Sequence, residues 1–197
     1  MIVGITCGGP DLVDRVRAAL EAGIDRVIVR ESVLPQGLDA LAESWPYRLV
    51  LHTRMPGAVA LAPNLPVALH YASDVRLAVR TNPFSVSAHA PAEVDHALGM
   101  GATWALLSPI WRSASKPGDR RRPLGMSVLR TPGAVALGGV SAERVGRCRA
   151  AGARGVAGMG GIFGARDVAE AVTAWRAAWG EVEAPRGPGQ KDQTSSS

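Results

Sequence analysis

Two glycine pairs in the last third of the chain have the types and spacing of an anion-binding site. Gly138-Gly139 and Gly160-Gly161 each follow a short apolar run, which predicts a buried parallel strand that ends close to the pair. Glycine has no Cβ, so backbone N–H groups at such positions can approach an anion closely. Either pair alone could serve a tight strand-to-helix turn. Two pairs in successive units favour a phosphate site.

Three of the four histidines fall at the ends of predicted strands, namely His52, His70 and His89. Convergent histidines could bind zinc, carry protons, or donate hydrogen bonds to an anionic ligand. Their spacing matches no metal motif, so polar lining and proton transfer are favoured over a metal. His96 falls inside a predicted helix and is expected at the surface or in packing.

Further polar residues follow the other predicted strands. Arg30 comes after the apolar residues 27–29, which favours a place inside the site, although a structural pair with Glu31 is an equal alternative. Ser87 ends the fifth predicted strand. Lys116 lies in a polar loop after the sixth and could close over a phosphate, or remain a solvated loop lysine.

The elements that must position these residues alternate between apolar runs and amphipathic segments. Strands are expected at 2–6, 26–30, 48–52, 67–71, 84–88, 103–107, 134–137 and 155–158. Three stretches share a helix–Gly–strand pattern, at 20–27, 98–105 and 149–156. Eight βα units predict an α/β fold, a (β/α)8 TIM barrel with parallel strands, whose chemistry lies at the C-terminal strand ends.

The domain is expected to span residues 1–180. Its last helix is predicted near 165–179, with Trp175 and Trp179 packing on the barrel. Residues 181–197 are rich in Glu, Pro, Gly, Gln and Ser, a composition that predicts a disordered tail.

Composition limits the function classes. The formal net charge is +5, and all but two of the 22 Lys and Arg residues are arginines. They are scattered, and aromatic residues make up only 5% of the chain, so a nucleic-acid surface is not expected. No apolar run reaches the length of a membrane span, and the two cysteines lack metal or disulfide spacing. We expect a soluble cytoplasmic protein without nucleic-acid or membrane partners; a homo-oligomer remains open.

Several motifs resemble those of thiamine phosphate synthases and their thiazole tautomerase (TenI) relatives. The resemblance covers roughly residues 1–179 and is specific over 85–163. The run 85–93, Ser-Val-Ser-Ala-His-Ala-Pro-Ala-Glu, is similar to the family's Gly-Val-Ser-x-His-Ser-x-x-Glu. The stretches 101–111, 136–140 and 158–163 resemble the family's Gly-Ala-Asp-Tyr-x-x-x-Gly-Pro-x-Phe segment and its two glycine loops, the last being closer to TenI.

The resemblance implies a substrate class and two alternative reactions. The synthase joins a pyrimidine pyrophosphate to a thiazole phosphate with the help of Mg²⁺, whereas the tautomerase isomerises the thiazole phosphate by proton transfer. In both, the loops after strands 7 and 8 hold the thiazole's phosphate, which implies that role for Gly138, Gly139, Met159 and Gly160 here. Lys116 matches the family's lysine in the loop after strand 6.

The chain departs from both active-site patterns. His52-Thr53 stand where the synthase has an Asn-Asp pair, and Asp74 could replace an acidic magnesium ligand only with a one-residue shift. Ser32 replaces the lysine after strand 2, and Pro109 replaces the tautomerase's proton-carrying histidine. Three functions therefore remain open: a TenI-like isomerase that needs no metal, a divergent Mg²⁺-dependent synthase, and a non-catalytic regulatory protein that binds the ligand.

Overall fold

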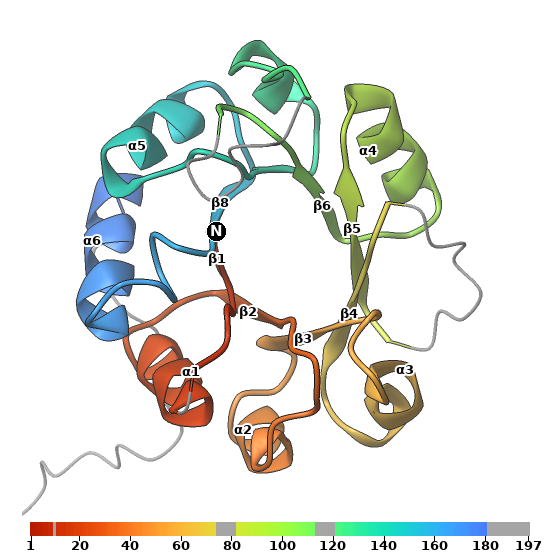
Figure 1. Ribbon diagram of the computed structural model, residues 1–197. Coiled ribbons are helices and arrows are strands. Elements are labelled where there is room, and N and C mark those ends of the chain that lie inside the picture. Colours follow the sequence, from red (N-terminus) through yellow and green to blue (C-terminus); the bar gives the residue numbers. More distant parts are fainter. Residues whose placement is uncertain (10, 74–81, 113–120, 181–197) are drawn as a thin grey trace, which may run out of the picture.

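The computed structural model, described for residues 1–9, 11–73, 82–112 and 121–180, is a closed barrel of eight parallel strands (Figure 1). The strands are β1 (Ile2–Ile5), β2 (Arg26–Val29), β3 (Leu49–His52), β4 (Ala68–Tyr71), β5 (Phe84–Ala88), β6 (Trp104–Leu107), β7 (Ala134–Ala136) and β8 (Gly155–Gly158). Each strand pairs with the next, and β8 closes the barrel against β1. The predicted fold class is confirmed, and all eight strands lie within one residue of their expected ends.

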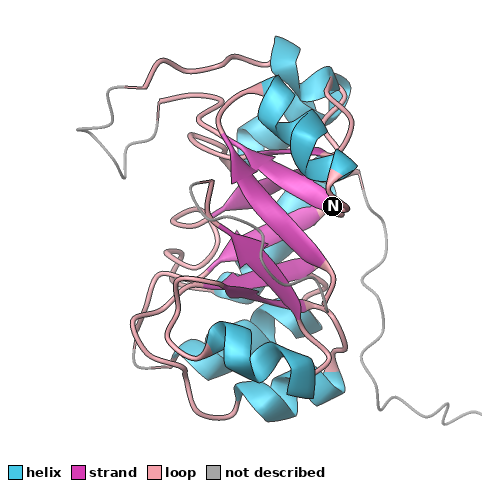
Figure 2. Cartoon of the chain, turned by 90° about the vertical axis from the view of Figure 1, so that its right-hand side faces the viewer, coloured by secondary structure: helices cyan, strands magenta, loops and turns pink. Residues whose placement is uncertain are grey.

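Helices cover much of the outside of the barrel (Figures 1 and 2). They are α1 (Leu12–Glu21), α2 (Leu38–Ser44), α3 (Ala58–Leu61), α4 (Pro91–Gly99), α5 (Ala142–Ala150) and α6 (Val168–Trp179), with short 3₁₀ turns η1 (Ala62–Asn64) and η2 (Ser127–Arg130). The glycines of the three predicted helix–Gly–strand units have φ of 92°, 94° and 95° at Gly23, Gly101 and Gly152. Side-chain-bearing residues are strained in that region, so glycine ends these helices as expected.

The final helix begins at Val168, three residues later than predicted. Asp167 is its N-cap, and its carboxylate accepts a hydrogen bond from the Glu170 N–H at 2.9 Å. Trp175 and Trp179 are buried, at 2% and 8% exposure, which confirms their predicted packing role.

Inside the barrel, inward-facing residues of β1–β3 and β6–β8 form a second core, separate from the layer between strands and helices. Its buried members are Val3, Ile5, Ile28, Val50, Trp104, Leu106, Val135 and Ala157. Two polar side chains, His70 and Ser85, are also buried in the β4–β5 wall, each at 1% exposure. The barrel interior therefore has an apolar wall and a polar wall, the latter formed by β4 and β5.

Some predictions fall on residues outside those described. Asp74, Lys116 and the tail 181–197 are among them. Among the described helices, none combines the length and apolar character needed to cross a membrane.

Candidate functional site

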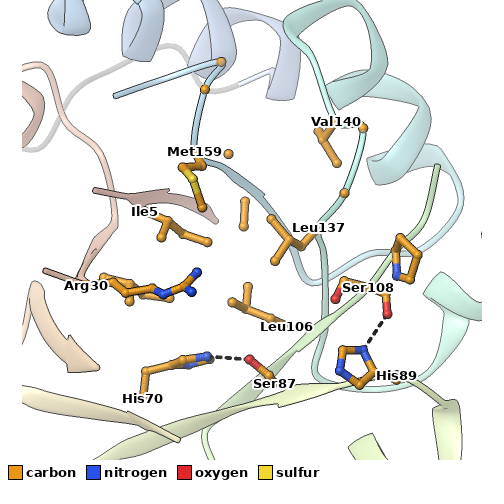
Figure 3. A pocket seen from close by; sticks show the side chains of 18 of the residues that line it. Ile5, Arg30, His70, Ser87, His89, Leu106, Ser108, Leu137, Val140 and Met159 are labelled. Carbon is orange, nitrogen blue, oxygen red and sulfur yellow. Dashed lines mark hydrogen bonds between the residues drawn. The ribbon is translucent and has the colours of Figure 1, made fainter. Parts of the chain in front are cut away.

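A cavity of about 870 Å³ opens at the C-terminal ends of the strands. Figure 3 shows side chains from several strands converging on it. The structure brings nine of the predicted site residues to its lining: Arg30, His52, His70, Ser87, His89, Gly138, Gly139, Met159 and Gly160. Its location matches the place where barrels of this type carry their chemistry.

The loop after β7 has its carbonyl groups held on one side. Three successive carbonyls accept hydrogen bonds: Leu137 from the Ile110 N–H at 2.9 Å, Gly138 from the Trp111 N–H at 3.0 Å, and Gly139 from Nη1 of Arg144 at 2.6 Å. The N–H and C=O of a trans peptide point in opposite directions. The N–H groups of Gly138, Gly139 and Val140 therefore point away from these donors, on the side of the cavity that the three residues line.

Glycine is needed in this loop for reasons of backbone shape as well. Gly138 and Gly139 have φ of 91° and 66°. A Cβ on Gly138 would lie 2.9 Å from Cα of Pro109, and one on Gly139 would lie 2.6 Å from the carbonyl oxygen of Arg112. The two interpretations of this glycine pair, a tight turn and an anion site, are therefore compatible. The tight turn is what exposes the amides.

In the loop after β8, a single carbonyl accepts the hydrogen bonds that orient the backbone. The Met159 carbonyl accepts hydrogen bonds from the N–H groups of Ile162, Phe163 and Gly164, at 3.2, 2.8 and 3.2 Å. The N–H of Gly160 shares the Met159 peptide and therefore points away from this turn. Unlike Gly139, Gly160 has open space where a Cβ would stand.

Arg15 of α1 holds the far end of the same loop. Its Nη2 donates to the carbonyls of Phe163 and Ala165, both at 2.7 Å. Gly161 packs against Trp175 of α6, since an added Cβ would lie 3.0 Å from the indole. The loop is thus fixed from the helical layer.

Among the described residues, the amides of Gly138, Gly139, Val140, Gly160 and Gly161 in the two loops have no hydrogen-bond partner. The first turn of α5 begins directly after Ser141, so the positive end of its dipole adds to them. Clustered N–H donors beside a helix N-terminus bind phosphate without themselves titrating. This arrangement suits a phosphate group.

His70 is hydrogen-bonded on both ring nitrogens. Nδ1 lies 2.9 Å from Oγ of Ser85, and Nε2 lies 2.9 Å from Oγ of Ser87. The ring stacks on Trp104, with centroids 6.0 Å apart. Burial, with the nearby charges of His52 and Arg30, lowers the pKa of His70 to about 3, so the ring is neutral at physiological pH.

His52 is also neutral. Its Nδ1 accepts the Arg54 N–H at 3.2 Å, so the neutral ring carries its proton on Nε2. Burial, and then the charges of Arg30 and Arg54, lower its pKa to about 4. The rings of His52 and His70 lie 5.4 Å apart. His52 is thus suited to donating a hydrogen bond rather than to accepting a proton.

His89 differs from the other two. Its Nδ1 donates to the carbonyl oxygen of Ser108 at 2.8 Å, as Figure 3 shows. This bond leaves the lone pair on Nε2, which lies 2.9 Å from Nη1 of Arg121. His96 is exposed on α4, as predicted.

Sequence reasoning missed most of the positive charge around the cavity. Five arginines line it: Arg30, Arg54, Arg112, Arg121 and Arg144. Arg30 is solvent-exposed yet points into the cavity beside Ile5 and His70 (Figure 3). No carboxylate is among the lining residues that the structure describes. Such a cavity favours a polyanionic ligand.

Within the described residues, no group of three His, Cys, Asp or Glu side chains is placed to hold a metal ion. The described part of the cavity therefore offers no set of hard oxygen ligands for Mg²⁺. Asp74, the residue that the sequence suggested for this purpose, lies outside the described range.

A family model described as thiamine monophosphate synthase matches residues 72–162, which include strands β5 to β8 and both glycine loops. Over this segment the chain is similar to thiamine phosphate synthases and their TenI relatives. A thiamine-phosphate synthase of Chromobacterium violaceum is 36% identical over 81 residues, which are 40% of this chain and 39% of that protein. The match to this relative therefore spans well under half of its length.

Solved structures agree on the fold across the whole barrel. A thiamine phosphate pyrophosphorylase from Pyrococcus furiosus superposes with a TM-score of 0.73 at 20% identity, covering 91% of this chain and 95% of that one. The corresponding protein of Bacteroides thetaiotaomicron gives 0.66 at 16%, covering 90% and 96%. A 3-hexulose-6-phosphate synthase from Salmonella typhimurium gives 0.62 at 14%, covering 91% and 98%. Identities this low show the fold alone.

Proposed function

We propose that this thiamine-biosynthesis-type barrel binds a thiazole phosphate and isomerises it. The proposal rests mainly on the loops after β7 and β8, whose carbonyls are held outward so that several backbone amides remain for an anion. The phosphate would lie on the amides of Gly139, Val140, Gly160 and Gly161. Hydrogen bonds from fixed N–H donors to a dianion are stronger than hydrogen bonds between two neutral groups.

The rest of the cavity suits a small heterocycle. Ile5, Leu106, Leu137 and Met159 form its apolar side, close to the phosphate loops (Figure 3). A thiazole ring would pack here while its polar atoms face Ser87 on the opposite wall. The balance of apolar wall and few polar groups is typical of sites for small molecules.

His89 is our candidate for the proton carrier. Isomerisation removes a proton from one atom of the ring system and returns one at another, with no net change in composition. The Nδ1–H bond to Ser108 places the lone pair of His89 on Nε2, where it can accept that proton and give it back. An anionic substrate would compete for Arg121 and leave Nε2 accessible. His52 and His70 are poorer bases because burial lowers their pKa values to about 4 and 3.

A Mg²⁺-dependent synthase is the second candidate, because the matched curated relative is named as a thiamine-phosphate synthase. That reaction would need Asp74 or Lys116 to supply groups that the described cavity lacks. A non-catalytic ligand-binding protein is the third alternative. It keeps the phosphate loops without the chemistry.

Incubation with thiazole phosphate, with and without a pyrimidine pyrophosphate and Mg²⁺, separates these candidates by mass spectrometry and NMR of the products. Isomerised thiazole in the presence of a chelator supports our proposal. Thiamine phosphate formed only with Mg²⁺ supports the synthase instead. Binding without conversion under all conditions supports the regulatory alternative and contradicts the assignment of His89.

A further inference from the structure

Hydrogen bonds link the side chains of Ser85, His70 and Ser87 in a row. Which group donates and which accepts in each bond can be assigned. Ser85 is buried at 1% exposure, and its hydroxyl has a single partner among the described residues, Nδ1 of His70. A buried hydroxyl proton without an acceptor is unfavourable, because it has lost its hydrogen bond to water and gained none in the protein. The Ser85 hydroxyl therefore donates, and Nδ1 of His70 accepts.

The tautomer of His70 follows from this bond. A neutral imidazole carries one proton, so a ring that accepts at Nδ1 donates from Nε2. The Nε2–H then donates to Oγ of Ser87. That bond occupies a lone pair of the Ser87 oxygen and leaves its hydroxyl proton without an acceptor among the described residues. Ser87 lines the cavity, so this proton is available to a ligand.

Burial, and then the neighbouring charges, keep the His70 ring neutral, and Trp104 packs against it. The indole stacks on His70 from β6, with an interplanar angle of 24°. The groups that face His70 electrostatically are His52 and Arg30, and both oppose its protonation. A protonated His70 would donate from both nitrogens and would abolish this assignment of donors and acceptors.

We propose that Ser85 is a positioning residue that fixes His70 as the Nε2–H tautomer, so that Ser87 presents a hydrogen-bond donor to an acceptor atom of the bound ligand. The ligand contact rests on the proposed function, whereas the tautomer is a property of the protein alone. The family motif that residues 85–93 resemble has glycine at the position of Ser85. The fixing of the His70 tautomer by Ser85 is therefore a feature of this chain. The cavity then selects ligands with an acceptor atom facing β5 over ligands with a donor there.

The tautomer is tested by ¹⁵N NMR of the histidine side chains, which are only four in number. His70→Gln assigns the signal. The wild-type protein should show a protonated Nε2 and an unprotonated Nδ1 between pH 5.5 and 8. Ser85→Ala should mix the two tautomers, while Ser87→Ala should retain the wild-type one. An Nδ1–H tautomer in the wild type, or an unchanged tautomer in Ser85→Ala, would overturn the proposal.

The ligand contact is tested with two probes, inorganic phosphate and thiazole phosphate. Ser87→Ala should weaken the binding of thiazole phosphate by about fivefold, the effect of one ordinary hydrogen bond. Ser85→Ala should weaken it by about twofold for an equal mixture of the two tautomers. Both variants should leave phosphate affinity unchanged. Unchanged thiazole phosphate affinity in both variants would overturn the contact. Equal wild-type affinity for the two probes would instead contradict the proposed function, and the tautomer experiment would still decide the role of Ser85.

Discussion

The guanidinium of Arg144 donates to the carbonyl oxygen of Gly139 at 2.6 Å and lies over the Trp111 ring, 5.1 Å from its centroid. Arg144 belongs to α5, the helix that follows the glycine loop, so the helix holds the orientation of the loop's last peptide. The adjacent Val140 N–H faces the cavity as a result. Arg144 is therefore as much a part of the anion site as the glycines themselves.

Replacement of Arg144 by alanine should weaken phosphate binding about 10-fold or more, because a charge-assisted hydrogen bond contributes about 1.5–3 kcal/mol. Arg147→Ala is the matched control. Arg147 lies over the same Trp111 ring at 6.0 Å and carries the same charge, but it is exposed. Calorimetric titration with phosphate compares the two. Equal losses in both variants would mean that overall charge, and not the Gly139 contact, determines affinity.

Alanine at Gly139 should destabilise the fold by at least about 1–3 kcal/mol, because the residue has a φ of 66° and a Cβ would collide with the Arg112 carbonyl. Gly160→Ala should change the free energy of unfolding by less than about 0.5 kcal/mol, since a Cβ there meets nothing within 4 Å. Urea denaturation of both variants measures the difference. A destabilised Gly160→Ala variant would show that this loop is packed more closely than described.

Stability should fall as the pH decreases from about 6.5 toward 4. Burial lowers the folded-state pKa values of His52 and His70 to about 4 and 3, from the ordinary histidine value of 6.5. Below 6.5 the unfolded chain therefore binds more protons than the folded one, and stability is lost. Each histidine contributes a slope of up to about 1.4 kcal/mol per pH unit.

The histidine contribution is isolated by urea unfolding at pH 7, 6 and 5 in the wild type and in His70→Gln. The variant should show a shallower pH dependence, whatever its absolute stability. His96→Gln, at an exposed position, is the control and should keep the wild-type slope. An equal slope in His70→Gln and the wild type would contradict the neutral, buried state of His70.

His89→Gln should abolish isomerisation while leaving the affinity for thiazole phosphate within about threefold of wild type. The glutamine side chain keeps an N–H donor for the Ser108 carbonyl but cannot accept and return a proton at neutral pH. A loss of about 10²–10⁴-fold in turnover is the usual effect of removing a general acid–base group. Full activity of this variant would move the proton transfer to another residue.

The strands were predictable because a buried parallel strand has an apolar run with turn residues at its ends. Runs such as 134–137 and 155–158 meet that condition, and glycine at 101 or 152 marks the preceding helix end. The start of α6 was missed by three residues. Asp167 is a good N-cap, but the apolar residues 162–163 before it resemble a first helical turn in sequence.

The site was predicted only in part, because its remaining determinants are contacts between distant segments. The link from Arg15 to the Phe163 carbonyl joins residues 148 apart in the chain, and no local pattern indicates it. Ser85 could have been placed by strand alternation with Ser87, which puts both on the inner face. Its pairing with His70 depends on the register between β4 and β5, which the sequence does not specify.

The most direct test of the central claim is an NMR titration of the backbone amides with thiazole phosphate. The signals of Gly139, Val140, Gly160 and Gly161 should shift most and together, with one saturation curve. Inorganic phosphate should move the same four amides at higher concentration. Unmoved glycine-loop amides, with shifts confined to residues around Arg30 and Arg54, would contradict the phosphate site and the function built on it.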